Sequence, residues 1–175
     1  MKRIKKLKNL PKNIFYDQMS SPVGLLTLFA SSRGIHFILW EEESNTDACK
    51  NILKHLENKK QHTIITETKC QLNEYFSGTR KIFNLPLCLE GTPFQIQAWK
   101  ELYKIPYGCT ISYGEQASRL GEKNKARAIG LANGMNPISI IVPCHRVVGS
   151  DGHLTGFGGG LEIKSLLLRL EKDNQ

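Results

Sequence analysis

The pattern of the sequence changes at Gly91, and this change limits what the chain can fold into. Before it, the β-rich runs IFYDQM, LLTLFA and IHFILW are separated by SSPVG and SSRG, which carry the Pro and Gly typical of turns. After it, helix start signals recur and apolar residues take helical spacing. We therefore predict that the 175 residues form a two-part α/β protein with a boundary near residue 90.

Residues 13–90 are expected to form an N-terminal α/β domain built on an antiparallel sheet with flanking helices. The three β-rich runs predict a meander within residues 14–40. The segments after it are predicted as an acidic loop at 41–47, helices at 48–60 and 67–77, and a further strand at 80–89. The spacing of the histidines in this part does not fit a metal site, and we interpret His36, His55 and His62 as incidental.

Residues 91–175 are expected to form a helix-rich domain with a helix-turn-helix and a short sheet. Thr92, Pro93 and Gln95 make a capping box with proline in the first turn, which predicts a helix start. Ser112 and Glu115 predict a second helix start by the same rule. Gly121 is expected to end that second helix, and Asn124 to cap a third over residues 125–134. Two short helices joined by a Gly-containing turn indicate the helix-turn-helix.

The helix predicted over residues 125–134 is rich in small residues. These are Ala126, Ala128, Gly130, Ala132 and Gly134. Each glycine destabilises a helix by about 1 kcal/mol relative to alanine, so a close approach is expected in return. The partner is either another helix or a nucleic-acid groove, and in the second case Arg127 is the long side chain that could reach inside.

The formal net charge is +8, and most of it lies at the start of the chain. Residues 1–12 hold six Lys or Arg and no acidic residue, so we expect a basic arm there. Such an arm either holds anionic polymers loosely or is a solvated tail. No apolar segment of the secretory type follows these lysines, and the longest apolar runs are far below the ~20 residues of a membrane helix.

The cysteines are odd in number, scattered, and nowhere spaced as CxxC. This argues against a disulfide framework and a zinc finger, and it favours a reducing, cytoplasmic location. The five are Cys49, Cys70, Cys88, Cys109 and Cys144.

Cys144 stands apart because it follows a buried-looking β-run in the stretch ISIIVPCHRVV. Pro143 has no N–H to donate, so we expect it to end that strand and leave the thiol at the mouth of a pocket. A turn would be needed to bring His145 near the sulfur, where it could act as the base that generates a thiolate. Glu162 and Glu171 are the candidate carboxylates to orient it. A loop at 149–160 with six glycines suggests a pocket wall that approaches a ligand closely.

These residues resemble one family, the methylated-DNA–protein-cysteine methyltransferases, also called O6-alkylguanine-DNA alkyltransferases. The similarity is carried by PCHRV at 143–147, TPFQ, ISYGE, KARAIG, ANGMNPISIIVPCHRVVG and LLLRLE. It covers nearly all of residues 91–175, whereas over 1–90 the likeness is architectural only.

The resemblance implies a DNA repair reaction that is irreversible and occurs once per molecule. Cys144 would accept the alkyl group from O6-alkylguanine, and also from O4-alkylthymine. His145 would act as base through an ordered water, with Glu171 orienting it and Asn136 bracing the turn before the cysteine. Tyr113 would help rotate the nucleotide and offer its hydroxyl to the base. A structural role is expected for Arg146.

The resemblance also implies binding to duplex DNA through the minor groove by a monomer, with no cofactor, no metal and no membrane contact. Arg127 would replace the flipped guanine in the stack. The other expected DNA contacts are Tyr113, Lys125, Ala126, Ala128 and Gly130, and the expected pocket residues are Ser139, Val147, Phe157 and Gly158. A cytoplasmic protein of this kind would be nucleoid-associated in a prokaryote.

Three pocket positions depart from the family pattern. Phe157 stands where many members have Tyr, Gly158 where some have Ser, and Ser139 where some have Pro. These changes predict a roomier pocket that accepts alkyl groups larger than methyl. Two other functions remain open at this point: a protein that binds DNA lesions without chemistry, and a Cys-His hydrolase of acyl groups.

Overall fold

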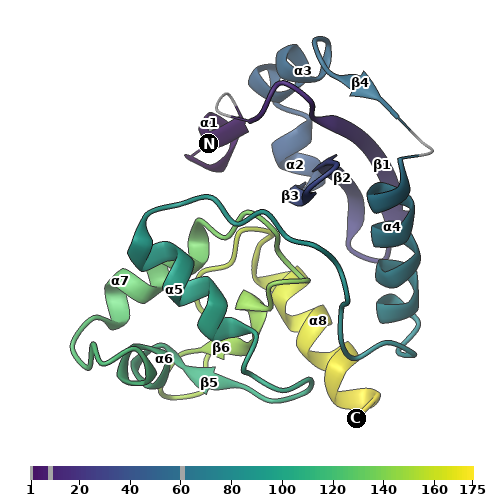
Figure 1. Ribbon diagram of the computed structural model, residues 1–175. Helices are drawn as coiled ribbons and strands as arrows, with labels where there is room; N and C mark the ends of the chain where they lie inside the picture. The colour runs from purple at the N-terminus through teal and green to yellow at the C-terminus, as the bar shows by residue number, and fades with distance from the viewer. Residues whose placement is uncertain (1, 8–9, 60–61) are drawn as a thin grey trace. The chain divides into compact units, whose positions relative to one another are not determined.

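The computed structural model describes residues 2–7, 10–59 and 62–175, and it divides into two compact units (Figure 1). The first unit is Met1–Leu89 and the second is Glu90–Gln175. Each unit has its own cluster of buried apolar side chains. Within the described residues, no helix has the length and apolar character needed to cross a membrane.

The first unit is built on a four-stranded sheet in the order β3-β2-β1-β4. Strands β1 (Phe15–Ser21), β2 (Gly24–Ser31) and β3 (Gly34–Leu39) run antiparallel in sequence order, and the short β4 (Glu57–Asn58) pairs parallel to β1. The predicted meander is therefore confirmed. Its first turn closes at Gly24, whose φ of 91° suits a residue without a Cβ.

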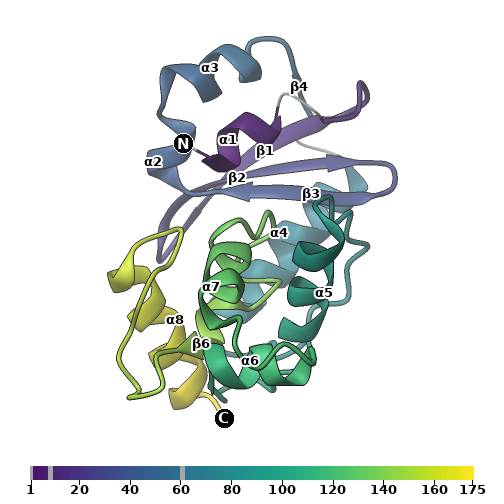
Figure 2. The same ribbon diagram turned by 90° about the vertical axis from the view of Figure 1, so that its left-hand side faces the viewer.

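Successive side chains of a strand point to opposite faces of the sheet, and most residues of β2 and all of β3 are buried, so both faces are covered. Figure 2 shows helices of this unit on either side of the sheet. Phe29, Phe37 and Leu39 pack with side chains of helices α1 (Lys2–Leu7) and α3 (Asp47–Leu53). Helix α4 (Thr63–Phe76) packs against the other face and contacts β1, β2 and β3. The fold class predicted for this half is the one observed.

The basic segment at the start of the chain is not a solvated arm over its described residues. Helix α1 buries Ile4 and Leu7 in the core of the unit. Arg3 is buried as well, with one guanidinium nitrogen 3.0 Å from Glu43 and another donating to the carbonyl of Ile38 at 2.6 Å. The interpretation as a solvated tail is therefore wrong for these residues, because charge count alone does not show that the apolar residues between the lysines lie on one helical face. Loose binding of anionic polymers stays a prediction.

Two further boundaries in this unit differ from the prediction. The expected acidic loop contains a short helix, α2 (Glu41–Ser44). The helix expected over 48–60 ends at Leu53, because the following residues pair with β1 as strand β4.

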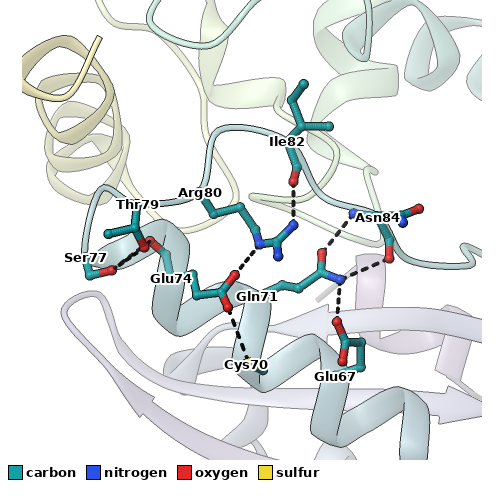
Figure 3. A network of polar contacts seen from close by, with 9 residues as sticks. All are labelled: Glu67, Cys70, Gln71, Glu74, Ser77, Thr79, Arg80, Ile82 and Asn84. Atoms are coloured by element: carbon teal, nitrogen blue, oxygen red, sulfur yellow. Dashed lines mark hydrogen bonds and ion pairs between the residues drawn. The ribbon is translucent and has the colours of Figure 1, made fainter.

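The segment 80–89 forms no strand, apart from one isolated bridge between Ile35 and Leu87. The Gln71 side chain forms hydrogen bonds with the backbone of Asn84 that a neighbouring strand would otherwise provide. Its oxygen accepts from Asn84 N–H at 2.8 Å, and its nitrogen donates to Asn84 C=O at 3.0 Å (Figure 3). Pro86 has no N–H to offer a ladder. The segment is thus held on helix α4 by a side chain, which periodicity does not reveal.

The second unit places four α-helices and one 3-10 turn around a short parallel sheet. Its elements are α5 (Pro93–Leu102), β5 (Ile111–Ser112), α6 (Tyr113–Arg119), α7 (Ala126–Gly134), the 3-10 turn η1 (Cys144–Arg146), β6 (Val147–Val148) and α8 (Leu161–Asp173). The capping box of Thr92 and Gln95 is formed as predicted, and Ser112 accepts from Glu115 N–H at 3.0 Å.

Helices α6 and α7 form the predicted helix-turn-helix. Gly121 follows the end of α6 with a φ of 76°, as a chain reversal after a helix requires. Helix α7 begins one residue later than expected, with Lys125 rather than Asn124 at the N-cap, because Lys125 N–H closes a turn onto Glu122 at 2.8 Å. Buried Gln116 and Asn133 join the two helices through a 2.8 Å hydrogen bond.

Candidate active site

Cys144 begins the 3-10 turn η1 and is only 6% exposed. The residues before it do not form the expected strand. Residues 138–142 make a turn instead, closed by Val142 N–H on the carbonyl of Ile138 at 2.9 Å. Ile140 lies in this turn with a φ of 75°, an uncommon conformation for a β-branched residue. Strain of this kind persists only where surrounding contacts impose it, and it often occurs at functional sites.

Asn136 supplies the contacts that impose this turn. Its side-chain oxygen accepts from Ile138 N–H at 3.1 Å, and its nitrogen donates to the carbonyl of Val142 at 2.8 Å. The same nitrogen lies 3.1 Å from Cys144 Sγ and donates to it. An N–H donor aimed at a sulfur favours the thiolate over the thiol. Asn136 therefore braces the turn and contacts the reactive atom at once.

His145 meets Glu171 of helix α8 in a fully buried pair, with Nε2 and Oε1 2.7 Å apart. Burial lowers the pKa of His145, although Glu171 opposes the shift, so the ring is neutral at neutral pH. With its proton on Nε2 facing the carboxylate, the ring keeps Nδ1 as the proton acceptor. Glu162, the other candidate carboxylate, lies exposed on the same helix.

Arg146 fixes the carboxylate that orients the histidine. Its Nε donates to Glu171 Oε2 at 2.9 Å, and another guanidinium nitrogen donates to the carbonyl of Ile105 at 2.7 Å. Gly108 N–H adds a hydrogen bond to Oε2 at 3.0 Å. Burial alone would raise the pKa of Glu171, but the hydrogen bonds from His145 and Arg146 and the positive charge of Arg146 lower it to about 2. Glu171 is therefore an ionised group in a fixed orientation.

Lys164 is a buried lysine in this region that the sequence analysis missed. It is fully buried, and its Nζ donates to the carbonyls of Val147 at 2.6 Å and Thr155 at 2.8 Å. Burial lowers its pKa to about 8, and the nearby Cys144 works against that shift. A signal was available: Lys164 stands three and seven residues before Leu167 and Glu171, on the face of α8 that is buried.

Tyr113 begins helix α6 beside this lysine. Its hydroxyl donates to the carbonyl of Thr155 at 3.1 Å and accepts from Lys164 Nζ at 3.5 Å. Burial raises the pKa of Tyr113, so the phenol keeps its proton at neutral pH. Strand β5 ends directly before Tyr113 and pairs with β6, which follows η1, so the small sheet brings this phenol to the cysteine side of the unit.

A cavity of about 540 Å³ lies between helix α7 and the glycine-rich loop. Its walls are Tyr113, Ala126, Arg127, Gly130, Gly134, Thr155, Gly156, Phe157 and Gly158. Cys144 is not among the residues that line it, so the thiol does not stand at the pocket mouth as expected. Phe157 links the cavity to the cysteine cluster. It lines the cavity, and its ring contacts the His145 ring edge-on, with the ring centroids 6.5 Å apart.

Four other predicted residues lie away from the cavity wall. Val147 is buried and acts through its carbonyl, and Ser139 is buried in the turn before the cysteine. Ala128 is half-buried on α7, and Lys125 is exposed with an ion pair to Glu122 at 2.8 Å. The contacts expected for these four with DNA or base stay predictions.

Both halves of the chain match models of one protein family. Residues 14–89 match the 6-O-methylguanine DNA methyltransferase ribonuclease-like domain, and residues 93–173 match the DNA binding domain of the same methyltransferase. A methylated-DNA–protein-cysteine methyltransferase of Methanosarcina barkeri is 44% identical over 92% of this chain and 99% of its own length. The chain belongs to the 6-O-methylguanine DNA methyltransferase family.

Solved structures agree with this assignment. The Mycobacterium tuberculosis O6-methylguanine methyltransferase superposes with a TM-score of 0.82 at 42% identity, covering 93% of this chain and 94% of the other. The Mycobacterium tuberculosis protein OGT in complex with DNA gives 0.80 at 43% identity, covering 91% and 94%. The resemblance seen in the sequence of the C-terminal half is confirmed, and the family extends over the N-terminal half as well.

Proposed function

We propose that this chain repairs DNA by moving the alkyl group of O6-alkylguanine, and of O4-alkylthymine, to its own Cys144. DNA repair by alkyl transfer follows from membership of the 6-O-methylguanine DNA methyltransferase family. The observation that carries the finer proposal is the cluster in which Asn136 donates to Sγ and the adjacent His145 is bound to an ionised Glu171. A neutral imidazole held by a fixed carboxylate is suited to take a proton from a thiol.

The transfer is a displacement at the alkyl carbon. His145 takes the thiol proton through a water, and Sγ forms a bond to the carbon as the bond from that carbon to guanine O6 breaks. The electron pair of the broken bond stays with the guanine, which gains a proton on its ring. We assign that proton to the Tyr113 hydroxyl, because the adjacent Lys164 ammonium stabilises the phenolate that results.

The alkyl donor in this proposal is DNA, which must present the base outside its stack. A sulfur atom cannot reach O6 in line within a stacked duplex, and extrusion of the base costs a few kcal/mol, roughly the value of several good contacts. Helix α7 of a monomer, lying in the minor groove, would supply these contacts and insert Arg127, which is exposed and lines the cavity. A thioether is not hydrolysed, so each molecule acts once. A cytoplasmic site of action fits this role and remains a prediction.

The test is to incubate the protein with duplex DNA containing O6-methylguanine and to measure its intact mass. We expect one added methyl group per molecule, mapped to Cys144 by peptide analysis. Cys144→Ala should abolish the adduct and keep DNA binding. Cys109→Ala is the matched control, because this exposed cysteine lies in the same unit and should leave the adduct intact.

The same experiment separates the two alternatives. DNA binding without an adduct would indicate a lesion-binding protein and contradict the proposal. Repeated hydrolysis of acyl esters without an adduct would indicate a Cys-His hydrolase, which also contradicts it.

A roomier pocket is the second part of the proposal. Phe157 and Gly158 line the cavity without side-chain polar groups. Ser139 does not line it but lies buried in the turn before Cys144, where some relatives have proline, so it would act through the position of that turn. We expect DNA with O6-ethyl- or O6-butylguanine to react faster, relative to O6-methylguanine, than in the Ser139→Pro variant. Equal ratios of rate constants in the two proteins would contradict this.

A further inference from the structure

Helix α7 presents a large apolar side chain to solvent. Leu131 is 71% exposed, whereas Ile129 and Ala132 on the other side of the helix are buried in the core. The residue lies four positions after Arg127, so the two side chains stand one above the other on the same face. The core of this unit therefore makes no use of Leu131.

The glycines beside Leu131 are not required by packing within the chain. A Cβ at Gly130 would meet the Tyr113 ring at 3.7 Å, an ordinary contact, and a Cβ at Gly134 would meet nothing within 4 Å. Neither glycine has a positive φ. Leu131 thus stands as a single apolar projection between two positions where another molecule could approach the helix backbone closely.

We propose that Leu131 is a DNA contact that packs against the sugars of the minor groove, one helical turn from Arg127. This inference rests on the proposed function. The groove walls are lined by deoxyribose C–H groups, and proteins that bind there often place apolar side chains in them. Such a contact adds affinity for duplex DNA without reading sequence, which suits a protein that must meet a lesion in any context.

The surroundings favour DNA over a second protein as the occupant of this face. Arg127 is exposed on this face, and its positive charge complements phosphates. Lys125 lies at the same end of the helix, where its exposed ion pair with Glu122 can exchange for a phosphate. The face is also continuous with the cavity wall formed by Arg127, Gly130 and Gly134. A bound duplex that delivers a base to this cavity would therefore pass over Leu131.

The test compares Leu131→Ala with the unchanged protein in two assays. Binding is measured in a Cys144→Ala background with a duplex that contains O6-methylguanine, over a range of salt concentrations. We expect affinity to fall about tenfold, because the apolar area that Leu131 would bury is lost. The slope of log Kd against log salt should not change, because no phosphate contact is removed. Leu131→Met should restore most of the affinity.

The second assay uses proteins that keep Cys144 and follows alkylation by the free base O6-benzylguanine. Leu131→Ala should react with this free base at the rate of the unchanged protein, since no duplex is involved. Ile82→Ala, at a position 78% exposed in the other unit, is the control for loss of an exposed apolar side chain and should change neither assay.

Each other outcome overturns the inference. Unchanged duplex affinity would show that Leu131 touches no DNA, and an equal loss in both assays would assign its effect to the pocket or the fold. A changed oligomeric state in Leu131→Ala would assign the face to a second copy of the chain. Failure of the unchanged protein to become alkylated would contradict the proposed function and not the inference about Leu131. The binding assay still tests that inference, because it uses the Cys144→Ala background and needs no alkyl transfer.

Discussion

At the scale of single residues, Glu171 connects more of the site than any motif suggests. It accepts hydrogen bonds from His145, Arg146 and Gly108, which lie far from it in sequence. The carboxylate is fully buried, so its charge is tolerated only because these donors surround it. Loss of that charge should therefore affect both stability and the orientation of the histidine.

Glu171→Gln should lower the free energy of unfolding at neutral pH by about 3 kcal/mol, because Arg146 is left buried without its partner charge. The pKa of Glu171 is lowered from 4.5 to about 2, so its contribution to stability is complete above pH 4.5. That contribution is lost as the pH falls from 4.5 toward 2. Denaturant unfolding over this pH range should show a larger loss in the unchanged protein than in Glu171→Gln.

Glu162→Gln is the matched control for this prediction, since Glu162 is exposed on the same helix. It should follow the pH dependence of the unchanged protein. Identical pH dependence in all three proteins would contradict the assignment of an ionised, buried Glu171.

At the scale of elements, helix α7 combines a stable inner face with an outer face that lacks bulk. Its inner face packs Ile129 and Ala132 against α5 and α6, and Trp99 Nε1 donates to the carbonyl of Ala132 at 2.8 Å. Its outer face contains glycines that weaken the helix. The glycines lower the intrinsic helix propensity of α7, and they lie on the face where we propose that DNA approaches the helix backbone.

Two glycines should respond in opposite ways to alanine. Gly134→Ala should raise the free energy of unfolding by about 0.5 kcal/mol, because a Cβ meets no atom and φ is negative. Gly121→Ala should lower it by about 1 kcal/mol, because its φ is 76° although the space is equally open. Thermal unfolding of both variants measures this. A shift of the same sign in the two would refute the argument.

At the scale of the whole molecule, the buried apolar side chains form a separate core in each unit, whereas the net positive charge is a property of the entire chain. Each of the two units has a core of its own, so the chain has two sources of stability. The net charge of +8 belongs to the chain as a whole and favours association with polyanions. The helix at the start of the chain uses Arg3 in an internal ion pair, so that charge is not available to a partner.

We expect binding to undamaged duplex DNA to weaken at least about tenfold between roughly 50 mM and 200 mM salt, because counterions are released from the phosphates. Lys125→Gln should reduce the slope of log Kd against log salt by about one. Fluorescence anisotropy with a labelled duplex measures both effects. Affinity that does not depend on salt would contradict an electrostatic contribution.

The sequence by itself determined the local features of this protein. Turn residues and alternation predicted the meander, hydroxyl caps predicted the starts of α5 and α6, and adjacency in PCHRV singled out the thiol and the imidazole. These features depend on contacts a few residues apart, so a one-dimensional pattern carries them.

Only the tertiary structure decided which distant side chains meet. It buried Lys164 beside Tyr113, replaced the expected strand at 80–89 by the pairing of Gln71 with Asn84, and folded residues 138–142 into a turn where a strand was expected. The roles of Glu171 and Asn136 had been implied by the family resemblance, but the residues alone left Glu162 open as the partner of His145. Each of these depends on a polar group finding a partner on another segment once water is excluded. The requirement that buried polar groups be satisfied acts in three dimensions, and hydrophobic periodicity along the chain does not encode it.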